Sequence, residues 1–586
     1  MAEKSKPLWN EKDQQLLEKL RVIRVRKEED FKPLPANSLL RGEIRNLEGD
    51  MVPFTLRYYQ VQGILNMLAV RRMVLGDGTG LGKTATSIGT MCYLWEKVPE
   101  MKVIVVAPKS AIRQWKSEIE RFTEGVKVHI ISTPKSGDPV EARKKIYEAW
   151  ETSTGPSVLI LNYAILIRDW NHGGIQPLLP NGRPDPKAPV KAGLLDSLVQ
   201  RHGPNLTVIL DEATAFKSRR TKTWEVVRFL SSYTRRVYGL TATLLKNNLM
   251  EGYNIYKAIK PDLFGSQQAF FDDFCYVEYK KVARGQKIPV VTGYKNLEQF
   301  KERIELVYLG RPKHLVSREL PTLITREVTF ELDRIEDLKY KEALSGILEL
   351  GDGDVREFTE TRMLTSLIYC QQVVNALALL KFQDGDQVLE WDALDGQVVK
   401  EVSSKEQALL DVLDELEDEK MIVYTRFASH VPRLMDILKK NKIVSTCITG
   451  KQNDDSRKKA QDSFQDLKSK TRVIFITAAG SEAINLQAAA GMVFFDMPWS
   501  WGDYVQIIGR MIRIGSPHQG VSCFHLLAER PGVGKDRRTI DHHVLSLLKR
   551  KKSLIDKVLG EAAIGALTFE KDGSSMRDLI KALQKG

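Results

Sequence analysis

Residues 71–84 read RRMVLGDGTGLGKT, and this stretch predicts the fold of the N-terminal half of the chain. Apolar residues lead into four glycines within seven positions, a Lys-Thr pair follows, and the run after Thr84 suits a helix. The pattern predicts a strand, a tight loop and a helix. The N–H groups of such a loop turn inward and the helix N-terminus adds partial positive charge, so the concavity suits a polyphosphate.

In this loop we expect Lys83 to reach the β- and γ-phosphates of a nucleotide and the Thr84 hydroxyl to ligate magnesium. The strict pattern G-x-x-x-x-G-K-[ST] is not met, because Asp77 stands at its first position. From the loop alone, a glycine-rich turn with an accidental Lys-Thr pair therefore stays open. The predicted nucleotide-binding residues of the loop are Asp77, Gly78, Thr79, Gly80, Leu81, Gly82, Lys83 and Thr84.

Length, charge and cysteine content restrict the class of protein. At 586 residues the chain is too long for one hydrophobic core, and its net charge of +13 favours a polyanionic partner. Nucleic acid is preferred over an anionic membrane, because no terminal segment is strongly amphipathic. The five cysteines lie far apart and form no Cys-x-x-Cys pair, which argues against a disulfide framework and against structural zinc.

The sequence also predicts where the protein works. No apolar run approaches the length of a membrane span, and the charged N-terminus lacks the apolar centre of a secretory signal. We therefore expect an intracellular, soluble monomer without a membrane partner. It would lie in the cytoplasm or nucleoid of a bacterial cell, or in the nucleus if the source is eukaryotic.

Apolar, β-branched segments alternate with helical patterns twice along the chain. Such near-continuous apolar strands, separated by helices, predict parallel sheets covered on both faces, with ligands at the C-terminal ends of the strands. The predicted strands are 102–107, 126–131, 157–162, 206–210 and 235–240 in the first unit, and 421–425, 442–448, 472–476 and 492–496 in the second. The fold class is therefore α/β with two parallel units in tandem.

Between and around these units the texture changes. Prolines and glycines in 171–191 predict an exposed insertion, and VLEWDALDGQVVKEV, around Asp395, predicts a hairpin. The predicted organisation is an N-terminal extension (1–50), a first lobe (51–265), a mainly helical insertion and linker (266–402), a second lobe (403–530) and a C-terminal segment (531–586).

Two adjacent carboxylates, Asp211 and Glu212, follow the apolar run 206–210. At the tip of a buried strand such charges need a cation or a proton to handle. Asp211 suits a magnesium shell shared with Thr84, because magnesium keeps most of its waters and needs few protein carboxylates. Glu212 would orient, or accept a proton from, the water that attacks the γ-phosphorus.

In the second unit, GDYVQIIGRMIRIG places Gln506, Arg510 and Arg513 at spacings of four and three. We expect a helix that aligns them on one face. The two arginines could then stabilise the transferring phosphoryl group, since guanidinium groups pair well with phosphate. The alternative is a solvated or DNA-facing stripe; a first-unit site that lacks its own arginine favours the catalytic role.

Over roughly residues 52–560 the chain resembles the Swi/Snf branch of superfamily 2 helicase-like ATPases in seven or more ordered segments. DGTGLGKT is similar to that family's Asp-x-x-Gly-Leu-Gly-Lys-Thr, which accounts for Asp77. The other matching segments are TLRYYQ, VIVVAPKSAIRQWKSEIERF, LILNYAIL, DEAT, GLTATLLKNNLME, MIVYTRF, ITGKQNDDSRKKAQDSF, ITAAGSEAINLQAA, QIIGRMIRIG and TIDHHVLSLLKRKKSLIDKVLG.

The resemblance implies two RecA-like lobes, a largely helical insertion, a C-terminal brace helix, and ATP with Mg2+ as cofactors. It assigns the adenine contact to Gln60 and catalysis to Lys83, Glu212, Arg510 and Arg513. It also assigns coupling to Thr241, Thr243, Gly480 and Gln506, and DNA contacts to Lys109, Tyr163 and Arg426. Departures from the family pattern lie at Tyr58, Thr214, Ala242, Leu244 and Ser516. Those at Thr214, Ala242 and Leu244 bear on how hydrolysis is coupled to DNA.

Three functions compete at this stage. The leading one is an ATP-dependent translocase or remodeller on double-stranded or branched DNA, and therefore a DNA-dependent ATPase. A strand-separating DNA or RNA helicase would share the ATPase but needs a wedge element that the sequence does not show. A non-hydrolysing nucleic-acid-binding scaffold would be expected to have lost Lys83, Glu212 or the arginines, and all are present.

Overall fold

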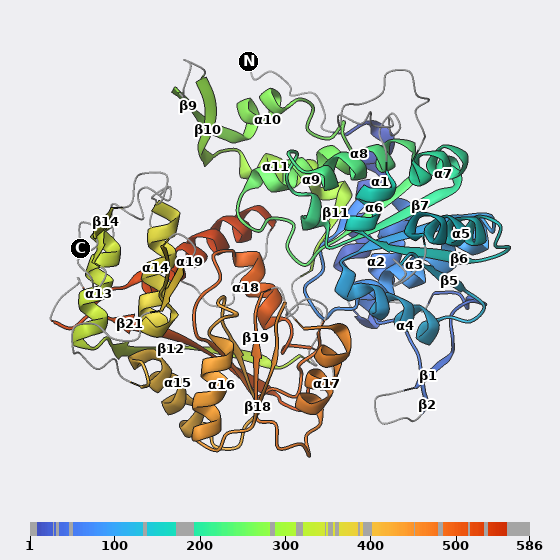
Figure 1. Cartoon of the computed structure of the whole chain (residues 1–586). Helices are drawn as coiled ribbons and strands as arrows, with labels where there is room; N and C mark the ends of the chain where they lie inside the picture. Colours follow the sequence, from blue (N-terminus) through green and yellow to red (C-terminus); the bar gives the residue numbers. More distant parts are fainter. Residues whose placement is uncertain are drawn as a thin grey trace. The chain divides into compact units, whose positions relative to one another are not determined.

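The computed structural model describes residues 9–26, 28–30, 34–45, 51–132, 138–170, 193–281, 287–311, 320–345, 347–349, 355–357, 363–384, 387–390, 401–450, 452–478, 484–513, 516–532 and 537–559. They form two compact units (Figure 1). Unit 1 comprises Met1–Arg318 with Lys557–Glu561, and unit 2 comprises Glu319–Asp556 with Ala562–Gly586. The predicted insertion at 171–191 lies outside the described residues, and so does most of the predicted hairpin around Asp395.

Unit 1 is built on a seven-stranded parallel sheet in the order β11-β3-β8-β7-β4-β6-β5. The strands are β3 (Arg72–Leu75), β4 (Lys102–Ala107), β5 (Lys127–Ile130), β6 (Ser157–Asn162), β7 (Leu206–Asp211), β8 (Arg236–Leu240) and β11 (Tyr308–Leu309). Every residue of β4 is buried, as expected for an apolar strand in the middle of a covered sheet. The predicted parallel α/β fold of this unit is confirmed.

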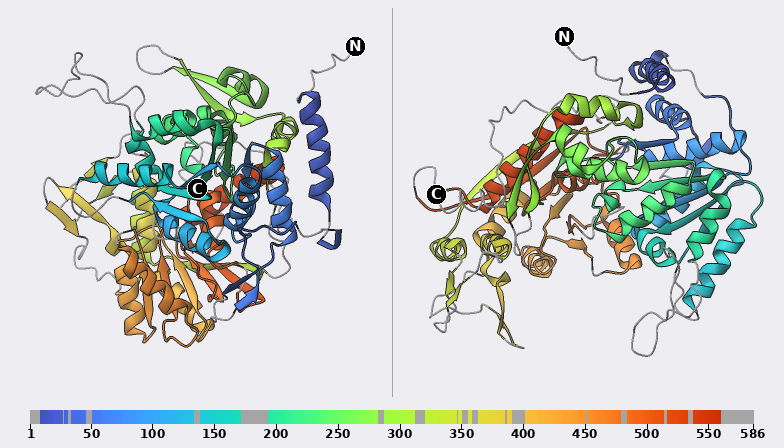
Figure 2. Two further views of the ribbon diagram at one scale, coloured as in Figure 1. Left: turned by 90° about the vertical axis from the view of Figure 1, so that its right-hand side faces the viewer. Right: turned by 90° about the horizontal axis from the view of Figure 1, so that it is seen from above.

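Helices lie along both faces of this sheet (Figure 2). They are α2 (Tyr58–Ala69), α3 (Lys83–Lys97), α4 (Ile112–Phe122), α5 (Pro139–Glu151), α6 (Tyr163–Asp169), α7 (Leu194–His202), α8 (Lys222–Tyr233) and α9 (Leu249–Ile259). The short 3-10 helices η2 (Lys109–Ala111), η3 (Gly203–Asn205) and η4 (Ala213–Phe216) connect them to strands. Helix α3 begins at Lys83, so the glycine loop leads directly into a helix N-terminus.

An N-terminal helix, α1 (Glu11–Val25), packs against the same unit. Asn10 caps it by accepting a hydrogen bond from the Asp13 amide. Arg24 donates to the Asn66 side chain on α2 and to the Glu305 carbonyl, and Arg21 pairs with the Glu305 carboxylate. These contacts join the first residues of the chain to a segment about 280 residues away, as the separation of 284 positions between Arg21 and Glu305 shows.

The rest of unit 1 surrounds an aromatic cluster. It contains α10 (Gln267–Phe274), the antiparallel hairpin β9 (Cys275–Lys281) and β10 (Lys287–Tyr294), α11 (Leu297–Ile304) and η6 (Glu305–Val307). Phe264 stacks on Phe300 with 5.1 Å between ring centroids, and Phe270 and Phe274 pack against both. This buried core carries the chain to β11 at the edge of the sheet. Two further short strands, β1 (Glu43–Arg45) and β2 (Met51–Pro53), pair with each other.

Unit 2 contains a six-stranded parallel sheet in the order β12-β21-β20-β17-β19-β18. Its strands are β12 (Thr322–Glu331), β17 (Met421–Tyr424), β18 (Ser445–Ile448), β19 (Val473–Ile476), β20 (Gly491–Phe494) and β21 (Gly520–Glu529). The four predicted strands of this unit are present. Strands β12 and β21 were not predicted from the sequence; they pair over all ten residues, from Thr322 opposite Gly520 to Glu331 opposite Glu529.

The central strands of unit 2 alternate between two hydrophobic cores. Ile422 and Tyr424 face a core shared with α14 (Met363–Asn375), α18 (Trp501–Ile508) and α19 (Ile540–Leu559). Met421 and Val423 face another core, shared with α15 (Ser404–Glu415) and α16 (Val431–Lys440). Side chains of a strand alternate sides, so this pattern covers both faces of the sheet.

The remaining elements of unit 2 lie around this sheet. They are α13 (Arg334–Ser345), η8 (Leu377–Leu379), α17 (Asp454–Gln465) and two hairpins, β13 (Ile347–Glu349) with β14 (Val355–Glu357) and β15 (Lys381–Asp384) with β16 (Gln387–Glu390). The segment 266–402, which the sequence analysis treated as one mainly helical insertion, thus supplies β11 to the first sheet and β12 to the second. Both strands are short or half-exposed edge strands, which leave only a weak apolar pattern.

Helix α19, the predicted brace helix, is fixed to unit 2 by buried charge. Lys405, at the start of α15, pairs with Asp541 at 2.7 Å, and both side chains are at most 1% exposed. The Asp541 carboxylate also accepts from the Ala528 amide of β21. Further along the helix, Lys549 pairs with Glu327 and Lys551 donates to the Trp499 carbonyl. The basic run at 549–552 is therefore partly engaged within unit 2.

We predict that Asp541→Asn destabilises unit 2 by about 3–5 kcal/mol, because it leaves the Lys405 ammonium buried without its counter-charge. Hydrogen exchange of the β21 amides measures this loss. Lys549→Met on the same helix is the control: its pair with Glu327 is partly exposed, so it should cost about 0–1 kcal/mol. Equal protection in Asp541→Asn and Lys549→Met would contradict the prediction.

Candidate active site

Four parallel strands of unit 1 end in one row, and the candidate site lies just beyond that row. Leu309 of β11 is paired with Leu75 of β3, Leu75 with Leu240 of β8, and Leu240 with Asp211 of β7. The glycine loop follows Leu75, the segment with Thr241 follows Leu240, and Glu212 follows Asp211. The register of the sheet therefore brings together three of the predicted motifs at the C-terminal edge, where α/β sheets bind ligands.

The glycine loop has the backbone of a phosphate cradle. Gly80 and Gly82 have φ of 84° and 75°, a left-handed backbone conformation that residues other than glycine rarely adopt. A Cβ on Gly82 would lie 2.5 Å from Nε2 of Gln60. The buried Gln60 side chain donates to the Leu81 carbonyl at 3.4 Å and accepts from the Arg57 amide at 3.0 Å. The predicted adenine contact thus also supports the loop.

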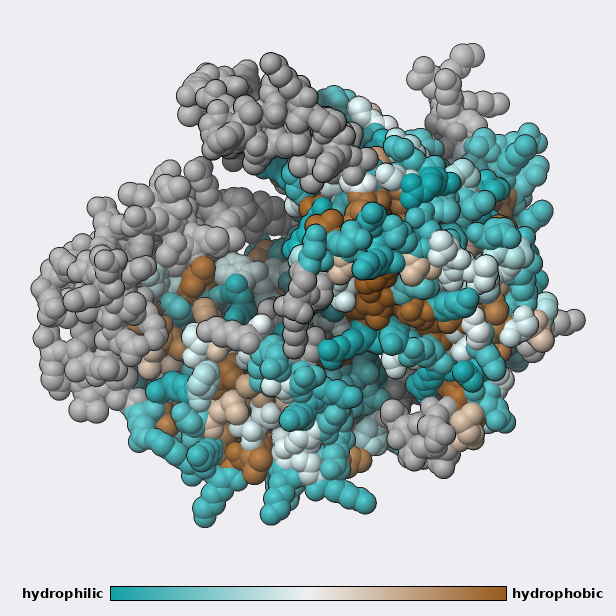
Figure 3. Space-filling model, turned by 45° about the vertical axis from the view of Figure 1, so that its right-hand side comes forward, coloured by the Kyte–Doolittle hydropathy of each residue, from teal (hydrophilic) through white to brown (hydrophobic). Residues whose placement is uncertain are grey.

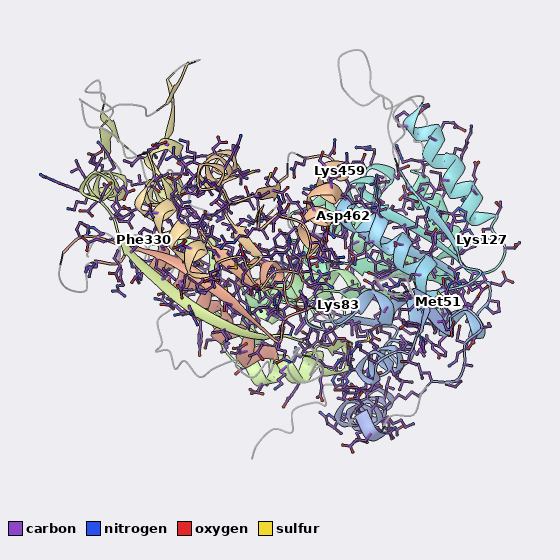
Figure 4. The ribbon with its side chains drawn as sticks, turned by 90° about the horizontal axis from the view of Figure 1, so that it is seen from below. Met51, Lys83, Lys127, Phe330, Lys459 and Asp462 are labelled. Carbon is purple, nitrogen blue, oxygen red and sulfur yellow. The ribbon has the colours of Figure 1, made fainter. Side chains whose placement is uncertain are left out.

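Lys83 lies at the first position of α3, among the elements of unit 1 (Figure 4). Its Nζ donates to the Asp77 carbonyl at 2.8 Å and to the Gly78 carbonyl at 3.4 Å. The ammonium group is therefore held across the loop that the sequence assigned to phosphates. Figure 4 also shows Lys127, on edge strand β5 of the same sheet, well away from Lys83.

Asp77 forms a buried ion pair that the sequence analysis missed. Arg311 donates from Nε to Oδ1 at 2.8 Å and from Nη2 to Oδ2 at 2.5 Å. The Asp77 residue is fully buried and Arg311 is 9% exposed. The two positions lie 234 residues apart in the chain, so no local pattern could have indicated this contact.

Asp211 is surrounded by neutral donors. The Trp115 indole N–H donates to its Oδ2 at 2.8 Å, and the Tyr163 hydroxyl donates to its backbone carbonyl at 2.7 Å. Burial and, to a smaller degree, the neighbouring Glu212 charge raise the pKa of the Asp211 carboxyl to about 6, although the Trp115 hydrogen bond and the Lys83 charge oppose the rise. A bound cation would stabilise the charged form of this buried carboxylate. Trp115 is a site residue that the sequence analysis quoted within a motif but did not single out.

Glu212 adopts an unusual backbone conformation. Its φ of 52° lies in the left-handed region, which is rare for a residue with a side chain. Its amide donates to the Asp211 Oδ1 at 3.0 Å, and its carbonyl accepts from the Ala215 amide at 2.8 Å as η4 begins. Strain of this type is found at functional sites, where the surroundings hold a side chain in one direction.

The segment after β8 is tied to the segment after Glu212. Thr241 accepts from the Thr243 amide through its hydroxyl at 3.1 Å. Glu251 on α9 accepts from the Lys217 ammonium at 2.8 Å and from the amides of Lys246 and Asn247 at 2.7 and 2.8 Å. These hydrogen bonds and charges lower the Glu251 pKa despite burial. Glu251 thereby connects the two loops, and the sequence analysis did not single it out.

The three predicted DNA contacts differ in exposure and in their hydrogen bonds. Lys109 is exposed on η2, whereas Tyr163 uses its hydroxyl within the site. In unit 2 the Arg426 guanidinium donates to Gln371 at 2.5 Å and lies over the Trp499 ring at 5.5 Å from its centroid. Desolvation lowers the Arg426 pKa. All three roles stay predictions.

The prediction that one helix aligns Gln506, Arg510 and Arg513 is wrong. Helix α18 ends at Ile508, so only Gln506 is helical. Hydrogen bonds from the amides of Arg510 and Met511 to carbonyls three residues back then form tight turns. Gly509 explains the end, because glycine is a poor helix former. Arg513 Nε donates to the Gly509 carbonyl at 3.0 Å. Gly480 lies outside the described residues.

The residues present in unit 1 fit a nucleotide with its magnesium. The loop offers backbone N–H groups at a helix N-terminus, and at Gly82 it passes so close to Gln60 that a side chain there would clash. Thr79 Oγ1 in this loop is buried and has no hydrogen-bond partner among the described residues, which suits a phosphate oxygen. Thr84 and Asp211 provide the oxygen ligands that magnesium prefers.

Comparisons with known proteins bear on the identity of this arrangement. The SNF2-related domain matches residues 59–379, and the helicase conserved C-terminal domain matches residues 404–515. The chain belongs to the SNF2-related family. This confirms the resemblance to Swi/Snf ATPases, and the family supports the predicted attributes of ATP binding, hydrolase, helicase and DNA binding. Two α/β units with parallel sheets of seven and six strands agree with the predicted pair of RecA-like lobes.

Similar curated proteins come from bacteria and yeast. An uncharacterized ATP-dependent helicase of Mycoplasma pneumoniae is 24% identical over 86% of this SNF2-related chain and 42% of its own length. The ISWI chromatin-remodeling complex ATPase ISW1 of Saccharomyces cerevisiae is 25% identical, and the match covers 91% of this chain and 43% of that protein. The uncharacterized ATP-dependent helicase YqhH of Bacillus subtilis is 23% identical, and the match covers 84% of this chain and 76% of that protein. The chain thus spans about two fifths of the first two relatives.

Among solved structures, the Sulfolobus solfataricus SWI2/SNF2 ATPase core in complex with dsDNA is 21% identical, with a TM-score of 0.37, and the match covers 91% of this chain and 96% of that one. Within the part of the chain that the structure describes, no helix has the length and apolar character of a membrane span. On the face that Figure 3 shows, the coloured residues are mostly hydrophilic, and apolar residues gather in separate patches.

We predict that Trp115→Phe weakens magnesium-dependent nucleotide binding about tenfold at pH 6.5 and much less at pH 8. The substitution removes a hydrogen bond that lowers the Asp211 pKa, so the pKa rises above about 6 and protons compete with magnesium. Titration of a fluorescent nucleotide with magnesium at both pH values measures the effect. Trp224→Phe is the control, since that indole donates to the Asn254 carbonyl instead. Superimposable profiles for Trp115→Phe and wild type would contradict the prediction.

Proposed function

We propose that this SNF2-related chain is an ATP-dependent translocase that couples ATP hydrolysis to movement on double-stranded DNA. The observation that supports this proposal is the row of strand ends in unit 1. It gathers Lys83, the Asp211 carboxylate and the Thr241 segment at one edge of the sheet. These are the groups that ATP binding, magnesium ligation and coupling require, and the family match supports the same chemistry.

In this proposal each residue of unit 1 has one task. Backbone amides of the loop and Lys83 bind the phosphates, Gln60 contacts the adenine, and Thr84 and Asp211 hold the magnesium. When bound, the magnesium neutralises charge on the β- and γ-phosphate oxygens. Glu212 orients the attacking water and takes its proton. Its left-handed backbone, held by Asp211 and Ala215, fixes the direction of its carboxylate.

Arg510 and Arg513 complete the proposed reaction from unit 2. Each guanidinium would stabilise the charge on the phosphoryl group as the lobes close on the nucleotide and DNA. The hydrogen bond from Arg513 Nε to the Gly509 carbonyl supports this role, because it restricts the side chain before any ligand is present. Gln506 and Gly480 would report nucleotide state to the DNA-binding residues.

Double-stranded or branched DNA is the proposed track. Excess positive charge supports a polyanionic partner, and the name of the relative ISW1 describes an ATPase of chromatin-remodeling complexes. Lys109, Tyr163 and Arg426 are the proposed contacts. We propose an active monomer whose two lobes have their main segments at 51–265 and 403–530, to which the region 266–402 adds β11 and β12. The organisation outside the lobes follows as an extension (1–50), a linker region (266–402) and a brace with its tail (531–586).

The strand-separating helicase stays the second candidate, because the names of two relatives include ATP-dependent helicase. The two readings differ on defined substrates. A translocase displaces a triplex-forming strand from a duplex more efficiently than it unwinds the duplex itself. Efficient unwinding of a long tailed duplex would favour the helicase. Absence of ATP hydrolysis with either DNA substrate would favour a nucleic-acid-binding scaffold.

We predict magnesium-dependent ATP hydrolysis that double-stranded DNA stimulates. Lys83→Ala and Glu212→Gln should each lower kcat by at least about 10³, while DNA affinity changes little, because both act on the phosphoryl group. Lys127→Ala is the control, since Lys127 is also a lysine of this sheet but lies on its far edge strand. Steady-state phosphate release measures kcat. Near wild-type turnover in either site variant would remove the proposed assignment.

The arginine role makes a separate prediction. Arg513→Ala and Arg510→Ala should reduce kcat at saturating ATP and DNA by about 10³–10⁵, with unchanged salt dependence of DNA binding, if they stabilise phosphoryl charge. Lysine at either position should rescue poorly, because it loses the planar fork. If saturating DNA restores kcat to Arg513→Ala and the salt slope falls by about one, the residue binds DNA instead.

A further inference from the structure

The segment Tyr308–Arg311, which we call the strap, runs beside the glycine loop at the edge of the unit 1 sheet. The Gly76 amide donates to the Leu309 carbonyl at 2.6 Å, and the Gly78 amide donates to the Arg311 carbonyl at 3.1 Å. The strap therefore extends the pairing of β11 with β3 into the loop itself. Both hydrogen bonds use amides on either side of Asp77.

The approach of strap and loop is close enough to require glycine. A Cβ on Gly76 would lie 2.3 Å from the Tyr308 hydroxyl, and so would a Cβ on Gly310. The Tyr308 side chain thus lies against two positions without side chains, one in the loop and one in the strap. The loop cannot move away from the strap without breaking this contact and two backbone hydrogen bonds.

Arg311 adds a buried charge contact to this approach. Besides its two hydrogen bonds to Asp77, its Nη1 donates to the Tyr59 carbonyl at 2.5 Å and to the Gln62 side chain at 2.9 Å, both on α2. A Cβ on Gly63 would lie 3.3 Å from its Nη2, so the guanidinium fits closely against α2. One side chain therefore joins the strap, the phosphate loop and the helix that carries Gln60.

The charge of Asp77 explains why such a contact matters for a nucleotide. Asp77 places a fully buried carboxylate at the start of a loop proposed to bind polyphosphate, and like charges repel strongly where water is excluded. An unpaired buried carboxylate is also costly to desolvate. The fork of an arginine matches both carboxylate oxygens, which a lysine cannot do. Arg311 can neutralise Asp77 and fix its orientation at once.

We propose that Arg311 is a positioning residue for nucleotide binding: through Asp77 it holds the phosphate loop in the conformation that accepts polyphosphate, and through α2 it sets Gln60 beside that loop. This inference rests on the proposed binding of ATP by unit 1. Arg311 does not contact the reacting atoms in this account. It acts on affinity in the ground state, so its removal affects binding more than the chemical step.

The test uses the full chain and a set of matched variants. These are Arg311→Gln, Arg311→Lys, the double variant Asp77→Asn/Arg311→Gln, and the control Arg303→Gln. Arg303 belongs to α11 of the same unit and pairs with Asp273 at 3.2 Å, but this pair is partly exposed and lies outside the loop. The dissociation constant of a non-hydrolysable magnesium–ATP analogue is measured without DNA. Turnover at saturating ATP and double-stranded DNA is measured separately.

We expect Arg311→Gln to weaken analogue binding about tenfold or more while kcat at saturation falls less than about threefold. The affinity of Arg311→Lys for the analogue should lie between those of Arg311→Gln and wild type. The double variant should bind better than Arg311→Gln, because it no longer contains an unpaired buried carboxylate. Hydrogen exchange at Gly76 and Gly78 should be faster in Arg311→Gln than in wild type or Arg303→Gln.

Other results overturn the inference. Wild-type analogue affinity in Arg311→Gln would show that the pair does not position the loop. A double variant that binds the analogue as weakly as Arg311→Gln would show that Arg311 acts by general packing and not by neutralising Asp77. Thermal unfolding of Arg311→Gln and Arg311→Lys shows whether each variant is folded at the temperature of the binding assay. If Arg311→Gln is not, the affinity of Arg311→Lys relative to wild type decides the same question. Failure of the proposed function has a different signature, in which wild type itself neither binds the analogue nor hydrolyses ATP.

Discussion

The pairing register of four parallel strands is the constraint on which the candidate site depends. One row across the unit 1 sheet is formed by Leu309, Leu75, Leu240 and Asp211. Each of these residues is followed by a segment that carries polar or charged groups of the candidate site. Backbone hydrogen bonds fix this row, and a slip of one residue would turn every side chain of a strand to the other face of the sheet. The site therefore inherits its geometry from buried apolar strands, not from contacts among the polar residues themselves.

Within this frame the carboxylates have different partners, and this separates their roles. Asp77 is matched by the Arg311 fork, so its charge is neutralised within the protein. The Asp211 carboxylate accepts hydrogen bonds from two neutral donors, the Trp115 indole and the Glu212 amide, and burial together with the Glu212 charge raises its pKa to about 6. A divalent cation would offset the buried negative charge of Asp211, whereas at Asp77 it would compete with an arginine already in place.

The sequence predicted what depends on local pattern. Continuous apolar runs such as 102–107 predicted the central strands, and the glycine spacing predicted the loop and the start of α3 at Lys83. It did not predict β12, whose residues are mostly exposed or half-exposed and which is defined by pairing with β21 about 200 residues later. The same limit applies to Arg311. A contact across 234 residues leaves no periodicity, because it is created by the sheet that brings β11 beside β3.

The end of α18 shows a second limit, which concerns backbone and not distance. Spacings of four and three suggested a shared helical face for Gln506, Arg510 and Arg513, but a helix requires every intervening residue to continue it, and Gly509 does not favour this. The chain turns instead, and the carbonyl exposed at the helix end accepts a hydrogen bond from Arg513. A backbone group of its own unit thus restrains that guanidinium. Any catalytic role for the arginines must follow from their chemistry and from this local anchoring, because the helical alignment that first suggested it is absent.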